Sequence, residues 1–181
     1  MIETIISNNC AGGAILHDLG MEFKTPTINL QILPEEYPKF CANLKDYMSA
    51  ELKRCSGVDE KHFNMIIKMF GGFPDMPMGI IDDVLVLFQH YKNFDEAQNM
   101  WSIRKKRIDY DNIGFIFHAR GEEYKQEAQE FISLNLPNKL CLTEGFSIPG
   151  SISFEGEAFS SVNNKLLITQ VYDFKKWMMK Q

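Results

Sequence analysis

A short polar loop near the start of the chain, from Ser7 to Gly13, has the residue types of an anion or polar-ligand site. It follows an apolar run over 2–6 and precedes a helix-compatible segment over 14–19. A strand, a small loop and a helix in this order direct backbone N–H groups and the positive end of a helix dipole at one point. The loop matches neither G-x-G-x-x-G nor G-x-x-x-x-G-K-[ST], so it does not indicate an ordinary dinucleotide or nucleoside triphosphate site.

The side chains of this loop are the first predicted ligand contacts. Asn8 and Asn9 carry amide donors and acceptors, which suit sugar hydroxyls, and the two glycines allow a ligand to approach the main chain. The alternative is an asparagine-rich tight turn that binds nothing. The predicted substrate-binding residues here are Ser7, Asn8, Asn9, Gly12 and Gly13.

Cys10 and His90 are the predicted catalytic residues. Cys10 lies at the expected helix N-terminus, where the dipole lowers a thiol pKa and favours a nucleophile. The alternative is a small, half-buried loop residue. His90 ends a predicted strand, where it is placed to act as a base or to position a ligand, and a structural histidine is the competing interpretation.

Further predicted substrate-binding residues come from the middle of the chain. Tyr91 follows the same strand as His90. Arg104 and Arg107, one helical turn apart, are placed to bind a phosphate, although cations at the end of a helix also stabilise its dipole without any ligand. Asn112 completes the predicted set. The pair Asp109 and Asp111 resembles a metal-binding D-x-D motif, but it precedes a strand, so capping is the alternative and no metal site is predicted.

The elements that must position these residues alternate between strands and helices. This alternation predicts an α/β domain with a mostly parallel sheet, helices on both faces and one domain over 1–181, with a lid or irregular segment at 145–161. Ligands bind at the carboxyl ends of such strands, so Ser7 to Cys10, 89–91, His118 with Arg120, and Thr143 with Glu144 are expected to converge. We expect strands near 2–6, 27–32, 84–90, 112–118, 139–143 and 166–172, and helices near 34–55, 94–108 and 122–134.

Composition limits the classes of partner. The 181 residues carry a net charge of -5, which disfavours nucleic acid or an anionic membrane as the main partner. No apolar run is long enough to cross a bilayer, and the start of the chain has no export signal. Four sparse cysteines without a C-x-x-C pair indicate reduced thiols and a cytoplasmic location.

A set of motifs spread over most of the chain points to a known family. Their combination resembles a bacterial family of unknown function associated with exopolysaccharide biosynthesis, domain of unknown function nineteen-nineteen. Ala11 differs, because family members often carry a bulkier aromatic residue there. The motifs are Ser7-Asn8-Asn9-Cys10-x-Gly12-Gly13, Asp18-Leu19-Gly20, Thr25-Pro26-Thr27, Phe88-x-His90-Tyr91, Glu96-Ala97, Trp101 and Arg104-x-x-Arg107-Ile108-x-Tyr110-Asp111-Asn112.

The resemblance implies a place in capsule or exopolysaccharide assembly, with glycosyltransferase-like or acyltransferase-like activity, and supplies no catalytic residues. The favoured hypothesis is a cytoplasmic transferase that acts on an activated sugar or glycan precursor, with a sugar or sugar-phosphate ligand, a nucleotide sugar as possible co-substrate and no other cofactor. The alternatives are thiol-dependent acyl transfer through Cys10, and a non-enzymatic sugar- or phosphate-binding module that works with polysaccharide assembly proteins.

Overall fold

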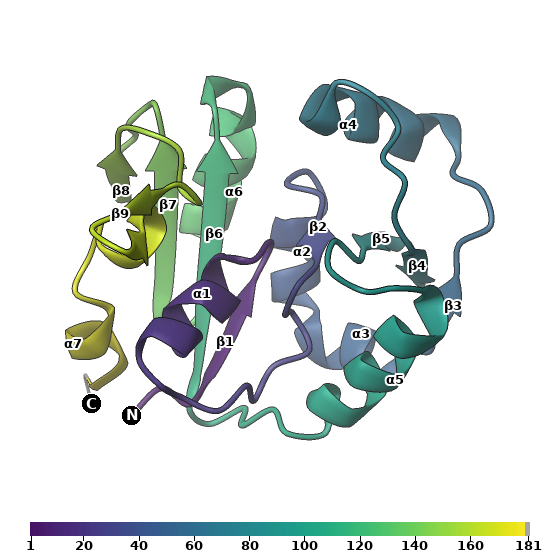
Figure 1. Cartoon of the computed structure of the whole chain (residues 1–181), viewed down its shortest axis with the longest axis horizontal. Coiled ribbons are helices and arrows are strands. Elements are labelled where there is room, and N and C mark those ends of the chain that lie inside the picture. The colour runs from purple at the N-terminus through teal and green to yellow at the C-terminus, as the bar shows by residue number, and fades with distance from the viewer. Residues whose placement is uncertain (180–181) are drawn as a thin grey trace.

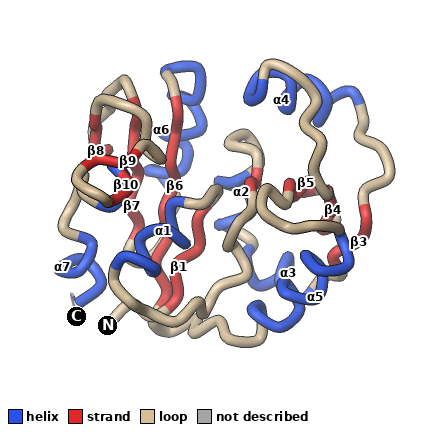
Figure 2. Tube along the Cα trace, in the orientation of Figure 1, coloured by secondary structure: helices blue, strands red, loops and turns tan. Residues whose placement is uncertain are grey.

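Two four-stranded sheets lie next to each other in the computed structural model, which describes residues 1–179 (Figures 1 and 2). The first sheet is parallel and has the order β1-β6-β7-β8, and the second is antiparallel with the order β2-β5-β4-β3. The strands of the parallel sheet are β1 (Thr4–Ser7), β6 (Ile113–Arg120), β7 (Lys139–Glu144) and β8 (Ser151–Phe154). Those of the antiparallel sheet are β2 (Gln31–Ile32), β3 (Leu52–Arg54), β4 (Met78–Ile81) and β5 (Val84–Leu87), and β9 (Ser161–Val162) pairs with β10 (Lys165–Leu166).

Seven α-helices and two 3-10 turns among residues 1–179 connect these strands. None of the helices in this range is both long and apolar enough to cross a membrane. The helices are α1 (Ala11–Asp18), α2 (Tyr37–Ala42), α3 (Leu44–Ser49), α4 (Glu60–Phe70), α5 (Phe94–Lys105), α6 (Lys125–Ser133) and α7 (Phe174–Met179), with turns η1 (Glu122–Tyr124) and η2 (Leu167–Thr169).

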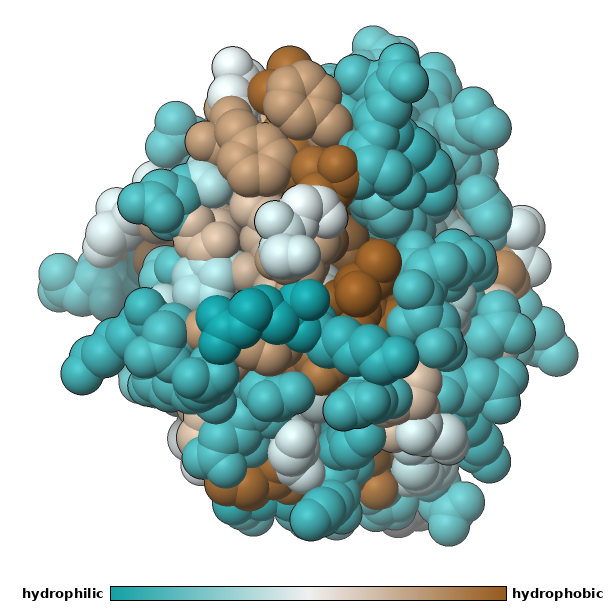
Figure 3. Space-filling model, turned by 90° about the vertical axis from the view of Figure 1, so that its right-hand side faces the viewer, coloured by the Kyte–Doolittle hydropathy of each residue, from teal (hydrophilic) through white to brown (hydrophobic). Residues whose placement is uncertain are grey.

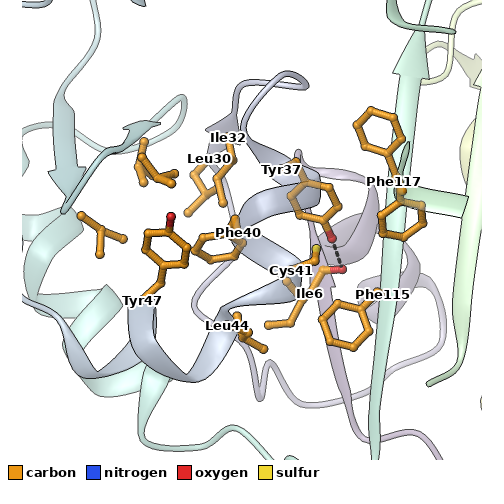
Figure 4. Packing of buried hydrophobic residues seen from close by; sticks show 14 of the residues in the cluster. Ile6, Leu30, Ile32, Tyr37, Phe40, Cys41, Leu44, Tyr47, Phe115 and Phe117 are labelled. Atoms are coloured by element: carbon orange, nitrogen blue, oxygen red, sulfur yellow. Dashed lines mark hydrogen bonds between the residues drawn. The ribbon is translucent and has the colours of Figure 1, made fainter. Parts of the chain in front are cut away.

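Neighbouring residues along β1 and β6 belong to different hydrophobic clusters, because successive side chains of a strand point to opposite faces. Ile6 and Phe117 pack with Tyr37 of α2, whose hydroxyl donates a hydrogen bond to the Ile6 carbonyl at 2.8 Å (Figure 4). Ile5 and Ile116 instead pack in the cluster that contains α1. Helix α6 packs in the Phe117 cluster together with α2, whereas α1 packs in the Ile116 cluster.

The expected α/β class and a parallel sheet are confirmed, but only three of the six predicted strands, those near 2–6, 112–118 and 139–143, lie in the parallel sheet. The segments predicted as strands at 27–32 and 84–90 form β2 and β5, which pair antiparallel in the second sheet. The predicted single helix over 34–55 is wrong in its continuity and its end, because it breaks at Asn43 into α2 and α3 and is followed by β3. The predicted strand over 166–172 is also wrong, since 167–169 forms η2.

The segment 145–161, expected as a lid or an irregular stretch, contributes β8 to the parallel sheet. Only six residues separate β7 from β8, far fewer than the dozen or more of an ordinary parallel crossover. Phe154 of β8 and Phe159 pack against the ring of His118, with ring centroids 5.8 and 5.9 Å away. These two aromatic side chains therefore pack over His118 and fill part of the interior at the edge of the parallel sheet.

Helix α4 was not predicted, and it covers one side of the antiparallel sheet. Asp59 caps it by accepting a hydrogen bond from the His62 amide at 2.8 Å. Phe63 and Phe73 stack on each other at the surface, 44% and 51% exposed. On the face seen in Figure 3, apolar side chains gather in the upper part, at the level of α4, next to a hydrophilic region.

Candidate functional site

The loop after β1 is held together by its own side chains. The Ser7 hydroxyl donates to the Asn9 carbonyl at 2.6 Å and accepts from the Gly12 amide at 3.1 Å. The Asn9 side-chain oxygen accepts from the Ala11 amide at 3.0 Å. The amides of Ala11 and Gly12, the first two of α1, are therefore bound within the loop and, contrary to expectation, do not point freely at an anion.

Asn8 joins the loop to the neighbouring strand. Its side-chain oxygen accepts from the His118 amide at 2.8 Å and its side-chain nitrogen donates to the His118 carbonyl at 3.0 Å. Both Ser7 and Asn8 are 0% exposed. These two predicted ligand contacts thus lie beneath the surface, where they fix the shape of the loop.

Asn9 begins a chain of hydrogen bonds that crosses the carboxyl edge of the parallel sheet. Its side-chain nitrogen lies 3.0 Å from His118 Nδ1, and His118 Nε2 lies 3.1 Å from Glu144 Oε2. An amide nitrogen can only donate, so Nδ1 accepts and the ring proton is on Nε2, which donates to the carboxylate. We call these three residues the Asn9–His118–Glu144 relay.

Burial and charge set the protonation states of this relay. His118 is 1% exposed, and this burial lowers its pKa more than the neighbouring Glu144 carboxylate raises it. Burial alone would raise the pKa of Glu144, but the hydrogen bond from His118 and the charge of Arg120 together lower it. Arg120 Nε lies 3.4 Å from Glu144 Oε2. At neutral pH the edge therefore holds a neutral imidazole, a carboxylate and a guanidinium.

A cavity of about 860 Å³, which we call the first cavity, opens at the carboxyl ends of β1 and β6. Its size is that of a small-molecule site, and open parallel sheets bind ligands outside the carboxyl ends of their strands. Its lining combines amide, cationic, imidazole and aromatic side chains with parts of α1 and β10. It is lined by Asn9, Cys10, Gly13, Ala14, His17, Asp18, Phe23, Ile28, Asn29, Gln31, Gln89, His90, Arg120, Phe159, Ser161, Asn164, Lys165, Leu166 and Thr169.

The structure places Cys10 and His90 on the wall of the same cavity. His90 is exposed at its rim. The Cys10 thiol donates to the Gln89 side-chain oxygen at 3.3 Å, and burial raises the pKa of this thiol to about 11. The expectation of a lowered thiol pKa is therefore wrong, because burial raises this pKa more than the backbone hydrogen bonds of Leu30 and Cys10 lower it.

The other predicted contacts do not line the first cavity. Tyr91 donates to the Ile28 carbonyl at 3.0 Å and accepts from Arg104 at 2.8 Å, so these two side chains bind each other. Arg107 forms an ion pair with Glu22 at 3.3 Å. Asn112 precedes β6 and therefore lies at the amino end of the parallel sheet.

The two carboxylates of the D-x-D motif also lie at this amino end. Asp109 accepts hydrogen bonds from the side chain and amide of Asn112 and from the Asp111 amide. The Asn112 hydrogen bond lowers the Asp109 pKa most, and Asp109 caps a turn, as the alternative interpretation stated. Across residues 1–179, no group of three or more His, Cys, Asp or Glu side chains is arranged to hold a metal ion.

Two charged residues of the site, Arg120 and Glu144, were expected to converge with the loop but were not counted among the contacts. Each ends a strand of the parallel sheet, and the register pairs them directly. The position of each at the end of an apolar strand was the signal available in the sequence. The link from Asn9 to Glu144 through His118 depends on the register of β6 against β7, which no local pattern specifies.

Comparison with known proteins places the chain in a family. The model of the domain of unknown function DUF1919 matches residues 2–180, so the chain belongs to this family. A protein of Haemophilus influenzae described as uncharacterized is 28% identical over 187 residues, which cover 96% of this chain and 82% of the relative.

Proposed function

We propose that this chain binds an activated sugar or a sugar phosphate in the first cavity and transfers its glycosyl group to an acceptor hydroxyl. The observation that carries this proposal is the lining itself. Five amide side chains, two aromatic rings and the Arg120 guanidinium surround one cavity, and these groups recognise hydroxyls, sugar faces and phosphate respectively. The amides are Asn9, Asn29, Gln31, Gln89 and Asn164, and the rings are Phe23 and Phe159.

The proposed phosphate contact is Arg120. Its ion pair with Glu144 uses Nε, so that pair does not take up the two terminal nitrogens, and its side chain is 48% exposed. Lys165, also on the wall, is paired with Asp18 at 2.8 Å. Arg120 is therefore the better-placed cation for a planar, two-point contact with phosphate oxygens.

The proposed reaction is a displacement at the anomeric carbon. The acceptor oxygen forms a bond to this carbon, the bond from the carbon to the phosphate oxygen breaks, and the phosphate leaves with the electron pair. Arg120 stabilises the charge on the leaving phosphate. The acceptor proton passes to the ionised carboxylate of Glu144, which His118 orients, while His90 at the rim positions the sugar.

The biological setting belongs to the same proposal. Exopolysaccharide or capsule synthesis in the cytoplasm would supply nucleotide sugars as donors and polysaccharide assembly proteins as partners. A binding module without catalysis would use the same cavity for recognition. The two versions differ in turnover, because both predict ligand binding.

The test is a binding titration with glucose 1-phosphate and a panel of nucleotide sugars, followed by a turnover assay. Binding should raise the melting temperature. Arg120→Gln should weaken binding by about tenfold or more, because a charge-assisted hydrogen bond is lost. Arg107→Gln is the matched control and should bind as the wild type does, since Arg107 pairs with Glu22 outside the cavity.

The proposal fails if no phosphorylated sugar binds, or if the two arginine variants bind equally well. Binding that depends on Arg120 but gives no turnover with any acceptor would support the accessory module.

A further inference from the structure

A second cavity, of about 530 Å³, adjoins the first at the carboxyl edge of the parallel sheet. Three residues line both cavities: Gln31, Gln89 and Arg120. On its other side the second cavity is bounded by Met69 and Phe70 of α4, the helix at the top of Figure 1. The two cavities therefore form one crevice that is divided by a shared wall.

The walls of the two cavities differ in charge. The second cavity is lined by the carboxylates of Glu123, Glu144 and Glu157, with Arg120 as its cation. The first cavity contains Arg120, Lys165 and two histidines, with Asp18 as its carboxylate. An anionic ligand is therefore favoured in the first cavity and disfavoured in the second.

A buried tyrosine also borders the second cavity. Tyr124 is 2% exposed, and within residues 1–179 its hydroxyl has no hydrogen-bond partner. A buried hydroxyl without a partner loses the hydrogen bonds that it would make in water.

The relay connects the two cavities through the protein. Asn9 lines the first cavity, Glu144 lines the second, and His118 is buried between them with one ring nitrogen bound to each. Glu144 has the position that the base of the proposed transfer requires. It borders the second cavity, and through His118 it is oriented by Asn9, which lines the first cavity.

We infer that the second cavity is the acceptor subsite of the same crevice and takes a hydroxyl-rich sugar that is uncharged or cationic. This inference rests on the proposed function, because it assigns the partner of the sugar phosphate bound in the first cavity. The acceptor hydroxyl would meet the donor at the shared wall of Gln31, Gln89 and Arg120, next to the Glu144 carboxylate.

The experiment measures the binding of three probe sugars by ligand-observed NMR, with the chain saturated with glucose 1-phosphate. The probes are glucosamine, glucose and glucuronate, which share the pyranose ring and differ in charge. The test variant is Glu123→Gln with Glu157→Gln, two exposed residues of the second cavity. The matched control is Glu122→Gln with Glu155→Gln, two exposed residues that do not line it.

The wild type should bind glucosamine about tenfold more tightly than glucuronate, since the exposed carboxylates of the second cavity attract a cation and repel an anion. The test variant should lose most of this preference, and the control should retain it. Equal binding of glucosamine and glucuronate, no probe binding, or a preference that survives in the test variant would overturn the inference.

A failure here is distinguishable from a failure of the proposed function. If glucose 1-phosphate itself does not bind, the first cavity is not a sugar-phosphate site, and both proposals fall. If it binds and depends on Arg120 while the probes ignore Glu123 and Glu157, only the acceptor subsite is rejected.

Discussion

The side-chain nitrogen of Asn9 lies 3.0 Å from Nδ1 of His118, and this contact fixes the state of the imidazole. The Asn9 oxygen is bound to the Ala11 amide, so the nitrogen must face the ring and donate to it. If Nδ1 also carried a proton, two N–H donors would face each other with no acceptor between them. Burial lowers the pKa of His118, and the loop after β1 sets the tautomer of the neutral ring and directs its Nε2 proton to Glu144.

The first prediction concerns the pH dependence of stability. Because the folded pKa of His118 is lowered below its ordinary value of 6.5, the unfolded chain binds more protons than the folded chain just below pH 6.5. The free energy of unfolding should therefore fall as the pH is lowered through that window. Urea unfolding of His118→Gln at several pH values should show a shallower decline than the wild type.

Glu144 acts in a separate window. Its pKa is lowered below its ordinary value of 4.5, so its contribution to stability is present above that pH and is lost as the pH falls further. For His118, parallel stability curves of the wild type and His118→Gln between pH 7 and about 5.5 would contradict the first prediction. They would show that the folded pKa of His118 is not lowered.

The second prediction separates the roles of two adjacent glycines. A Cβ at Gly12 would lie 2.7 Å from the Ser7 hydroxyl oxygen and 3.1 Å from Ile5. Gly12→Ala should therefore destabilise the fold by about 1–3 kcal/mol, because the overlap is with buried atoms of β1. At Gly13 the nearest atom is the end of Ile28 at 3.3 Å, and Gly13→Ala should change stability by less than about 1 kcal/mol.

Denaturant unfolding of both glycine variants checks this difference. A Gly12→Ala protein as stable as the wild type would show that α1 does not need close contact with Ser7.

The third prediction concerns Cys10. With a pKa of about 11, its thiol is ionised to only about 0.1% at pH 8. In a Cys55→Ser background, where the other two cysteines are buried, iodoacetamide should modify Cys10 about 100-fold more slowly than free cysteine. Mass spectrometry over time measures this rate. Modification as fast as that of free cysteine would restore Cys10 as a nucleophile and revive the acyltransferase hypothesis.

The fourth prediction distinguishes the two candidate bases. Glu144→Gln keeps an acceptor for His118 but removes the negative charge, so kcat should fall by about 10²–10⁴ while the KM for the donor changes little. His90→Gln should raise KM with a smaller effect on kcat, because His90 is exposed at the rim. A larger loss of kcat in His90→Gln would assign the base to His90.

Much of the parallel sheet followed from the sequence because its strands are continuous apolar runs. Helix α5 was also predictable, since Phe94, Ala97 and Trp101 recur at three- and four-residue spacing and all are buried. The break between α2 and α3 was not, because the apolar spacing continues through Asn43. There the Asn43 side chain donates to the Lys39 carbonyl at 3.0 Å and the backbone leaves the helical region.

The second sheet was missed because its pairing depends on a tight turn. Asp82 adopts a positive φ of 52° between β4 and β5, and the two strands pair directly across it. Two adjacent aspartates between apolar runs are a turn signal, but no strand was predicted at Met78–Ile81, on the N-terminal side of this turn.

The position of the candidate site could be predicted from the sequence, but the burial and hydrogen bonding of its side chains could not. The turn after β1 and His90 do line one cavity, although β5, which precedes His90, lies in the antiparallel sheet and not beside β1 as expected. Burial of Ser7 and Asn8 could not be predicted, because asparagine-rich loops look the same whether they bind a ligand or a neighbouring strand. Here Asn8 pairs with the backbone of His118, which is 110 residues away.

The most direct test of the central claim is a crystal structure of the chain soaked with glucose 1-phosphate or with the nucleotide sugar that binds most tightly. The account predicts electron density in the first cavity, with the phosphate within hydrogen-bond distance of Arg120 and the sugar against the amides of Asn9 and Gln89. Density at another surface, or a ligand in the cavity that turns its phosphate away from Arg120, would contradict it.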